Sequence, residues 1–337
     1  MTRWTYDPAT GACLTKRYPD GSQVAYSVTP DGLPSETMKA SGARLQNVYD
    51  ASRRLVGTIS SDGAGDAAFA YDAFGKMTAA SNDVAQYAYA RHRGGIVTNE
   101  TVHVGGGAHL LVRTVDGFGR LAGRGVFGQE AQAISYDDRG RVAAVSNGEV
   151  GVAYVYGEDG TDAGYVLSVS GGTTVERRVV RDVYRPEQVV AVSNSVNGAL
   201  FAAATYARDA LGRVAEREDA GCGTWAAFAY DAIGQVVEAG SRPLSSTNCS
   251  FASYAYDQIG NIAGSAALSY TTDGEVTGFG GMTFGYDSAS RLTTVATGGV
   301  TIATYAYDAF DRRVRKTTKV VANLSFLWTE LKSATSL

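Results

Sequence analysis

Hydrophobic and polar positions alternate along the chain in short runs, and an Asp and a Gly interrupt most of the runs. In the stretch FAYDAFGKM, Phe69 and Tyr71 are two positions apart, so both rings lie on one face of a strand and the small residue between them faces the other way. Asp72 is typical of a residue that opens a turn, because its carboxylate accepts backbone N–H bonds. Gly75 suits a left-handed position, and the polar and apolar residues after it begin a return strand. The pattern predicts a β-hairpin at each such motif.

The motif recurs over the whole chain, which indicates a repeat protein. Anchor intervals are 22 residues (49 to 71), 44 (71 to 115), 21 (115 to 136), 22 (208 to 230) and 21 (286 to 307), which gives a period near 21–22 with occasional insertions or deletions. A chain of 337 residues with this period holds about 15 hairpins, or roughly 30 strands, and stacked hairpins stabilise one another through nearest-neighbour contacts. The residues predicted to build the repeated strands and turns are Tyr49, Asp50, Tyr71, Asp72, Gly75, Tyr136, Asp137, Gly140, Arg141, Tyr230, Asp231, Gly234, Tyr256, Asp257, Gly260, Tyr286, Asp287, Tyr307 and Asp308.

The last copy of the motif differs from the earlier ones. It shares the letters AYDAF with the copy at Tyr71, but Asp311 stands where that copy has Gly75. Aspartate can adopt the left-handed conformation, though less easily than glycine. The last copy is also strongly basic, with Arg312, Arg313, Arg315, Lys316 and Lys319. These side chains could dock an acidic partner or a downstream segment. The alternative is that they form an exposed, charged final strand that discourages aggregation between sheet edges.

The composition agrees with an all-β protein. Glycine (41 residues) and tyrosine (20) are abundant, as expected for many turns between aromatic strands. The Gly-rich stretches fall inside the repeat rhythm, so we expect one repeat domain over residues 1–323. A short tail at 324–337, helical or disordered, follows it. The N-terminus has no apolar signal segment, and no apolar run is long enough to form a membrane-spanning helix.

Charge and cysteine content exclude several kinds of function. A net charge of −4 and a pI near 5.5 disfavour nucleic-acid binding, which needs a basic surplus. Cys13, Cys222 and Cys249 contain no C-x-x-C pair. Free buried thiols are favoured over a Cys222–Cys249 disulfide. His103 and His109 flank a glycine run that is too loose to fix a metal geometry. No cofactor or metal is expected.

Carboxylate pairs and tyrosines each have a structural and a functional interpretation. Asp137/Asp138 and Asp308/Asp311 are interpreted as turn-capping groups rather than as an acid–base pair. The tyrosines recur at one position of the unit, which favours packing between hairpins over stacking on sugar rings. The sequence therefore predicts no catalytic residues.

The recurrent Tyr-Asp-x-x-Gly-Arg-hydrophobic unit resembles the YD repeat of bacterial Rhs proteins. The same repeat occurs in the shell-forming C components of insecticidal toxin complexes and in teneurins. The resemblance covers nearly all 337 residues, with eight literal Tyr-Asp anchors. It implies an all-β hairpin solenoid coiled into a spiral or a partial hollow shell. The self-cleaving segment and toxin domain of the bacterial relatives are not matched, so no protease residues are carried over.

The resemblance implies a non-catalytic shell segment that encloses or presents another polypeptide, as part of a toxin-delivery or contact-dependent bacterial competition system. Its partners would be a polypeptide guest, the remaining shell segments, or a second copy that pairs through sheet edges. The chain would then be secreted or displayed at the cell surface, by an unknown export route. The alternative is a cell-surface adhesin or carbohydrate-binding repeat module.

Overall fold

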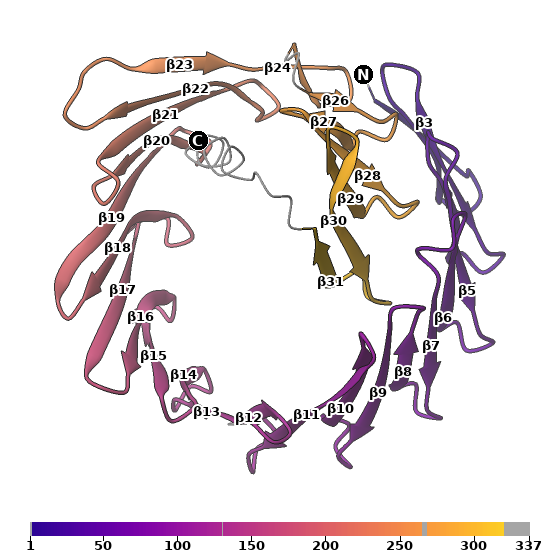
Figure 1. Ribbon diagram of the computed structural model, residues 1–337, viewed down its shortest axis with the longest axis horizontal. Coiled ribbons are helices and arrows are strands. Elements are labelled where there is room, and N and C mark those ends of the chain that lie inside the picture. The colour runs from indigo at the N-terminus through magenta and orange to yellow at the C-terminus, as the bar shows by residue number, and fades with distance from the viewer. Residues whose placement is uncertain (1, 130, 265–267, 320–337) are drawn as a thin grey trace. The chain divides into compact units, whose positions relative to one another are not determined.

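The computed structural model describes residues 2–129, 131–264 and 268–319. These residues form β-strands joined by turns and loops, and there is no helix among them (Figure 1). The described residues hold 31 strands, compared with roughly 30 expected for the chain, and consecutive strands pair in antiparallel fashion over long stretches. The predicted all-β hairpin solenoid is thereby confirmed. The predicted tail at 324–337 lies outside the described residues.

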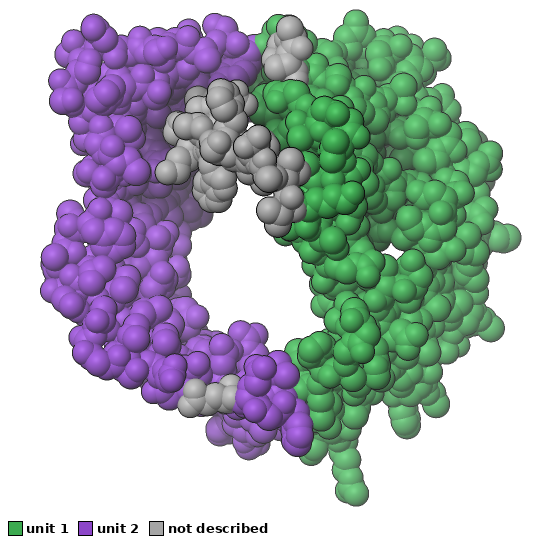
Figure 2. Space-filling view, in the orientation of Figure 1, with its two compact units in different colours: residues 1–111, 255–336 green, residues 112–254, 337 purple. Residues whose placement is uncertain are grey.

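The chain divides into two compact units (Figure 2). Unit 1 comprises residues 1–111 and 255–336, and unit 2 comprises 112–254, as far as these are described. Strand β11 (Gly107–Val115) contains the boundary between them. The interpretation of residues 1–323 as one repeat domain stays a prediction.

The first part of unit 1 is a run of ten strands in which each strand pairs with the next. They are β1 (Arg3–Tyr6), β2 (Cys13–Arg17), β3 (Gln23–Val28), β4 (Pro34–Met38), β5 (Arg44–Tyr49), β6 (Leu55–Ser60), β7 (Ala67–Tyr71), β8 (Met77–Ser81), β9 (Ala85–Arg91) and β10 (Val97–Val104).

The second part of unit 1 holds a short pair of strands and a six-stranded antiparallel sheet. The pair is β24 (Ala255–Tyr256) and β25 (Ile262–Ala263). The sheet runs in chain order through β26 (Ser269–Tyr270), β27 (Val276–Phe279), β28 (Met282–Tyr286), β29 (Leu292–Thr297), β30 (Val300–Tyr307) and β31 (Arg313–Thr318).

Unit 2 is a single antiparallel sheet in which each strand again pairs with the next. Its strands are β12 (Leu121–Val126), β13 (Gln132–Tyr136), β14 (Val142–Ser146), β15 (Val150–Tyr156), β16 (Asp162–Val169), β17 (Thr173–Arg181), β18 (Val189–Val196), β19 (Ala199–Arg208), β20 (Val214–Asp219), β21 (Thr224–Tyr230), β22 (Val236–Pro243) and β23 (Ser250–Ser253).

Most Tyr-Asp motifs form a tight turn with a bulge at the tyrosine, whereas the copy at Tyr256 pairs with Ile262 without a register shift. In the copy at Tyr71 the register shifts between Ala70 and Tyr71, and Gly75 has φ of 79°. The copies at Tyr49, Tyr286 and Tyr307 lack glycine at this position. Arg53, Ser290 and Asp311 adopt the same left-handed conformation there, with φ of 64°, 63° and 60°. The turn geometry therefore survives the loss of glycine, as predicted for Asp311.

The buried core lies in unit 1. Ala80, Ala85, Tyr87 and Val102 are buried on β8, β9 and β10, where residues from the β30–β31 turn pack against them. About half of the side chains in unit 2 are half-buried and nearly all the others are exposed, because they belong to one layer of sheet. The repeat tyrosines thus pack along the sheet, and full burial occurs where a second layer covers β7–β10.

Candidate functional site

The aspartate of each motif closes its own turn. The Oδ1 of Asp72 accepts the backbone N–H groups of Phe74 and Lys76, each at 2.9 Å. The backbone N–H of Gly75 donates to the carbonyl of Asp72 at 3.0 Å. The same carboxylate-to-backbone pattern occurs at Asp50, Asp137, Asp231, Asp257, Asp287 and Asp308. These hydrogen bonds leave Oδ2 available to a neighbouring side chain.

Where the motif carries an arginine four residues after the aspartate, the guanidinium binds Oδ2. Arg141 does so with Asp137 at 2.8 Å, and its guanidinium lies 4.0 Å from the ring centroid of Tyr156 in the next hairpin. The Tyr156 hydroxyl donates to the carbonyl of Val142 at 2.8 Å. Each cation–π contact of this kind is worth about 0.5–1 kcal/mol at an exposed site. The Asp–Arg–Tyr contacts therefore connect one hairpin to the following one.

We call this arrangement the Asp–Arg–Tyr ladder. Its other links between neighbouring hairpins are Asp50–Arg54–Tyr71, Asp116–Arg120–Tyr136, Asp209–Arg213–Tyr230 and Asp287–Arg291–Tyr307. Each of these tyrosine hydroxyls also donates to a backbone carbonyl at 2.7–2.8 Å. The faces and hydroxyls of these tyrosines are thus engaged within the sheet.

The last link of the ladder reaches a different part of the chain. Arg312 binds Oδ2 of Asp308 at 2.7 Å, and its guanidinium lies 5.0 Å from the ring centroid of Tyr87 on β9. The Tyr87 hydroxyl donates to the same Oδ2 at 2.7 Å, and Asp308 is 0% exposed. The amide of Asn82 also donates to the carbonyl of Tyr307 at 2.8 Å. In Figure 1 the turn end of the β30–β31 hairpin points toward β8 and β9.

The preceding turn is attached to the β6–β7 turn. Asp62 accepts the backbone N–H of Ser288 at 2.7 Å and its hydroxyl at 2.5 Å. Arg291 donates to the carbonyl of Ala64 at 2.5 Å. Arg291 also pairs with Asp311 at 2.7 Å. Two consecutive Tyr-Asp turns therefore bind the amino-terminal strands of unit 1.

An apolar side chain completes this contact. The ring of Phe310 lies 6.0 Å from that of Phe69 and 5.5 Å from that of Tyr87, in tilted and edge-on arrangements that favour aromatic attraction. Phe74 occupies the same position of the motif in an earlier copy and is 90% exposed. We call the whole contact the seam, comprising Asp62, Asn82, Tyr87, Ser288, Arg291, Asp308, Phe310 and Arg312.

The seam carboxylates are held in their ionised forms. Burial by itself raises the pKa of Asp308, but hydrogen bonds from Tyr87 and Arg312 outweigh it and leave the pKa below its ordinary value. Burial also raises the pKa of Asp62, yet the hydrogen bonds from Ser288 lower it to about 2. Burial and the Asp308 carboxylate raise the pKa of Tyr87 to about 12. At neutral pH the phenol is therefore a permanent donor to a charged acceptor.

The basic cluster predicted as a docking group divides in two. Arg312 binds Asp308 and lies over Tyr87 in the seam, although its side chain is 55% exposed, and its predicted docking role stays a prediction. Arg313 lies 5.2 Å from the ring centroid of Tyr305 on the neighbouring strand. Arg315, Lys316 and Lys319 are exposed. These three stay candidates for contact with an acidic partner.

The repeat motif does not mark the seam residues of the amino-terminal strands. Tyr87 belongs to an aromatic-x-Tyr pair with Tyr89, but no Tyr-Asp turn follows it, so it falls outside the motif. Asn82 and Asp62 lie in turns without the Tyr-Asp letters. Only the aromatic pair carried a signal, because period-two aromatic spacing marks the strand face on which the seam forms.

Histidine, cysteine and acidic side chains are the possible metal ligands in the part of the chain that the structure describes. No cluster of His, Cys, Asp or Glu there could hold a metal ion. The three cysteines are free thiols, but Cys222 is exposed because it lies in the β20–β21 turn, and Cys13 and Cys249 are half-buried. The expectation that the free thiols are buried was wrong. No helix within residues 2–129, 131–264 and 268–319 is long and apolar enough to cross a membrane.

The fold defines the class of protein as an all-β repeat built of Tyr-Asp hairpins. No protein-family model and no curated protein matches the chain. Solved structures do match: the crystal structure of TcdB2-TccC3-Cdc42 is 15% identical with a TM-score of 0.69, over 94% of this chain and 20% of that one.

Two further structures agree with this match. The crystal structure of TcdB2-TccC3 is 15% identical with a TM-score of 0.69 and covers 96% of this chain and 21% of the other. A structure of the Photorhabdus luminescens Tc holotoxin pore is 14% identical with a TM-score of 0.68, over 96% and 20%. This chain thus has the fold of a segment of these toxin-complex chains and spans about a fifth of their length.

Proposed function

We propose that this chain is a non-catalytic segment of a YD-repeat shell of the Rhs type, and that it encloses or presents another polypeptide in a toxin-delivery or competition system. The observation that carries the proposal is the seam. A ladder that links neighbouring hairpins ends, in its last described link, on Tyr87 of a strand 221 positions earlier in the chain. A sheet whose last described turns bind its own earlier strands is suited to holding a guest polypeptide, because the geometry of the sheet does not depend on that guest.

The carboxylates support a structural rather than a catalytic role. The turn aspartates accept two or more backbone N–H bonds each, and several also bind an arginine. A general acid or base needs a pKa near the working pH, whereas hydrogen bonds hold the pKa of Asp137 and Asp209 below the ordinary carboxyl value even though burial opposes this. These groups therefore serve as caps.

Guest protection tests the proposal. A disordered reporter segment is joined after Leu337 and digested with proteinase K, beside the same reporter joined to an unrelated monomeric domain. The account predicts slower cleavage of the reporter on this chain, and faster cleavage again when Asp62→Ala and Phe310→Ala open the seam. Equal cleavage rates on both carriers would contradict a role in enclosure. If the fusion is protected, secretion or display at the cell surface becomes the next property to measure.

One observation favours the alternative of a carbohydrate-binding module. Trp4 and Tyr6 on β1 are 50% and 58% exposed and line an open cavity of about 550 Å³ together with Tyr26 and Glu36. Exposed rings beside a carboxylate suit the C–H faces and hydroxyls of a sugar, whereas the ladder tyrosines are already engaged. A glycan array read with wild type and Trp4→Ala tests this alternative, and a silent array would remove it.

A further inference from the structure

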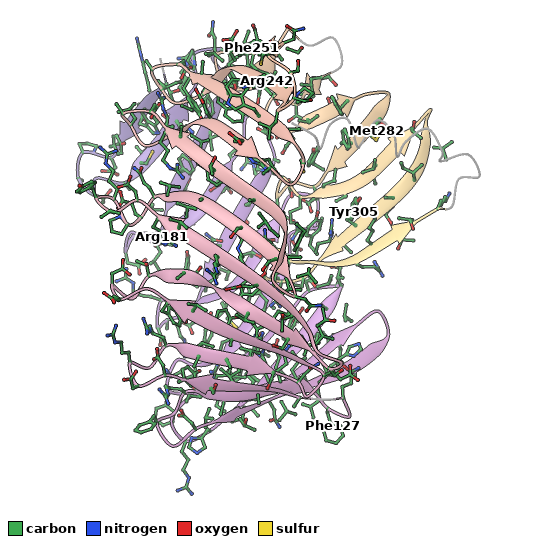
Figure 3. The ribbon with its side chains drawn as sticks, turned by 90° about the vertical axis from the view of Figure 1, so that its left-hand side faces the viewer. Phe127, Arg181, Arg242, Phe251, Met282 and Tyr305 are labelled. Carbon is green, nitrogen blue, oxygen red and sulfur yellow. The ribbon has the colours of Figure 1, made fainter. Side chains whose placement is uncertain are left out.

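The turns of unit 2 present a row of six side chains at one edge of the sheet. Because consecutive strands are antiparallel, every turn that leads from an odd to an even strand lies at the same edge. Figure 3 shows Arg181, at the end of β17, on this edge and Phe127, in the β12–β13 turn, on the opposite one. We call the third residue of each such turn its tip. The tip row is Phe118, Arg139, Asp159, Tyr184, Leu211 and Ile233.

The apolar members of the tip row are far more exposed than aromatic and aliphatic side chains usually are. Phe118 is 88% exposed and Tyr184 is 93% exposed. Leu211 and Ile233 are also exposed. Large apolar side chains as exposed as these are candidates for burial against another protein surface. At the seam of unit 1, the same position of the motif holds Phe310, which packs between two aromatic rings. The motif therefore has a precedent for burying its tip against protein.

The order of the first four tips is self-complementary. It reads aromatic, positive, negative, aromatic: Phe118, Arg139, Asp159, Tyr184. Neighbouring tips are separated by two strands, or about 10 Å, so the four are evenly spaced. A two-fold axis between Arg139 and Asp159 places each arginine opposite the aspartate of a second copy and each Phe118 opposite a Tyr184. An isologous contact requires this property, that residue i faces j while j faces i.

We propose that a second copy of this chain docks on the tip row through this two-fold contact. Both charges are available, because Arg139 makes only a long 3.5 Å contact with the carbonyl of Glu158 and Asp159 accepts hydrogen bonds from Thr161 on the exposed side of the turn. The proposal does not rest on the shell function, and either can fail without the other.

The order of charged and apolar side chains in the tip row favours a second copy of this chain over an unrelated sheet as the partner. A partner chosen only for apolar contact would favour Tyr184, Leu211 and Ile233, the three consecutive apolar tips. The alternating charges between Phe118 and Tyr184 would then lie outside the contact, with nothing opposite them. The two-fold arrangement instead gives each of the four tips a complementary partner. The small contact area predicts a weak dimer with a micromolar dissociation constant.

A charge-swap experiment tests the proposal by sedimentation velocity at concentrations up to about 100 μM. Arg139→Asp gives two negative tips per copy and Asp159→Arg gives two positive tips, so each variant alone should associate at least about tenfold more weakly than wild type. Mixed together, the two variants are complementary again and should form a heterodimer. Wild type that stays monomeric, or a mixture that associates no more than its components, would overturn the proposal.

The apolar half of the contact has a matched control. Phe118→Ser and Tyr184→Ser should each weaken dimerisation about tenfold or more, whereas Phe127→Ser should leave it unchanged. Phe127 is 75% exposed but belongs to the opposite edge of the sheet. An equal loss with Phe127→Ser would place the contact elsewhere and overturn the assignment to the tip row. All three positions are exposed turns, so the folded state is retained.

Discussion

The phenol of Tyr87 donates a hydrogen bond of 2.7 Å to the carboxylate of Asp308, which lies 221 positions further along the chain and has no exposed surface. The same oxygen binds Arg312 at 2.7 Å, and Arg312 in turn lies over the Tyr87 ring. The three side chains repeat the geometry of the Asp–Arg–Tyr ladder, with Tyr87 in the place that the next hairpin's tyrosine takes elsewhere. Other repeats make this Asp–Arg–Tyr contact with the following hairpin, whereas the last repeat makes it with a strand that lies far away in the sequence.

The two phenylalanines of the AYDAF motif should differ sharply in their effect on stability. Phe310→Ala removes a ring that packs against Phe69 and Tyr87, so we expect a loss of roughly 2–4 kcal/mol in the free energy of opening of β30–β31. Phe74→Ala removes a ring that is 90% exposed and should change stability by less than about 0.5 kcal/mol. Amide hydrogen exchange on the strands adjoining each turn measures both values. Equal losses would contradict the assignment of Phe310 to the seam.

The seam should weaken in acid. The folded-state pKa of Asp62 is about 2, below the ordinary value of 3.8 that applies in the unfolded chain, because Ser288 and neighbouring groups donate hydrogen bonds that outweigh its burial. A depressed carboxyl pKa contributes stability that is complete above about pH 4 and is lost as the pH falls toward 2. Asp308, whose pKa is also lowered against the effect of burial, acts in the same direction.

Hydrogen exchange of β28–β31 between pH 5 and pH 2 tests this dependence. We expect the protection of these strands to fall over that window in wild type and to fall less in Asp62→Asn, which has no carboxylate to titrate. Asp83→Asn is the control, since Asp83 lies in the β8–β9 turn and makes no seam contact. A pH profile that Asp62→Asn leaves unchanged would show that this carboxylate does not hold the seam.

The left-handed turn position should tolerate side chains at a measurable loss. Gly75 has φ of 79° with open space around it, so Gly75→Ala introduces backbone strain without a clash and should destabilise the hairpin by about 1 kcal/mol. Gly94 does not have a positive φ, and Gly94→Ala should have little effect. Thermal unfolding of the two variants provides the comparison. A larger loss for Gly94→Ala would contradict the turn assignment.

The hairpin fold could be predicted from sequence because its signals are local. Aromatic spacing of two, a turn aspartate and a glycine or Asp311 at the left-handed position each specify backbone geometry within a few residues, and the structure has that geometry. The seam could not be predicted in the same way. It depends on which strand lies beside the last turns. In the sequence, Asn82 and Asp62 look like ordinary polar turn residues, and only the structure shows that they contact Tyr307 and Ser288.

The repeated sequence motif also does not indicate which copies make long-range contacts. Phe74 and Phe310 stand in identical AYDAF contexts, and one is exposed while the other is packed. Asp137 and Asp308 cap their turns with the same pair of backbone hydrogen bonds, and only Asp308 is buried. The difference arises from long-range packing, which a periodic pattern cannot encode.

A double-mutant cycle on Tyr87 and Asp308 tests the central claim, that the last repeat binds β9 through this pair. The free energy of opening of β31 is measured by amide hydrogen exchange in wild type, Tyr87→Phe, Asp308→Asn and the double variant. A hydrogen bond to a charged group predicts a coupling energy of about 1.5–3 kcal/mol between the two changes. Single effects that add to within about 0.5 kcal/mol would contradict the claim.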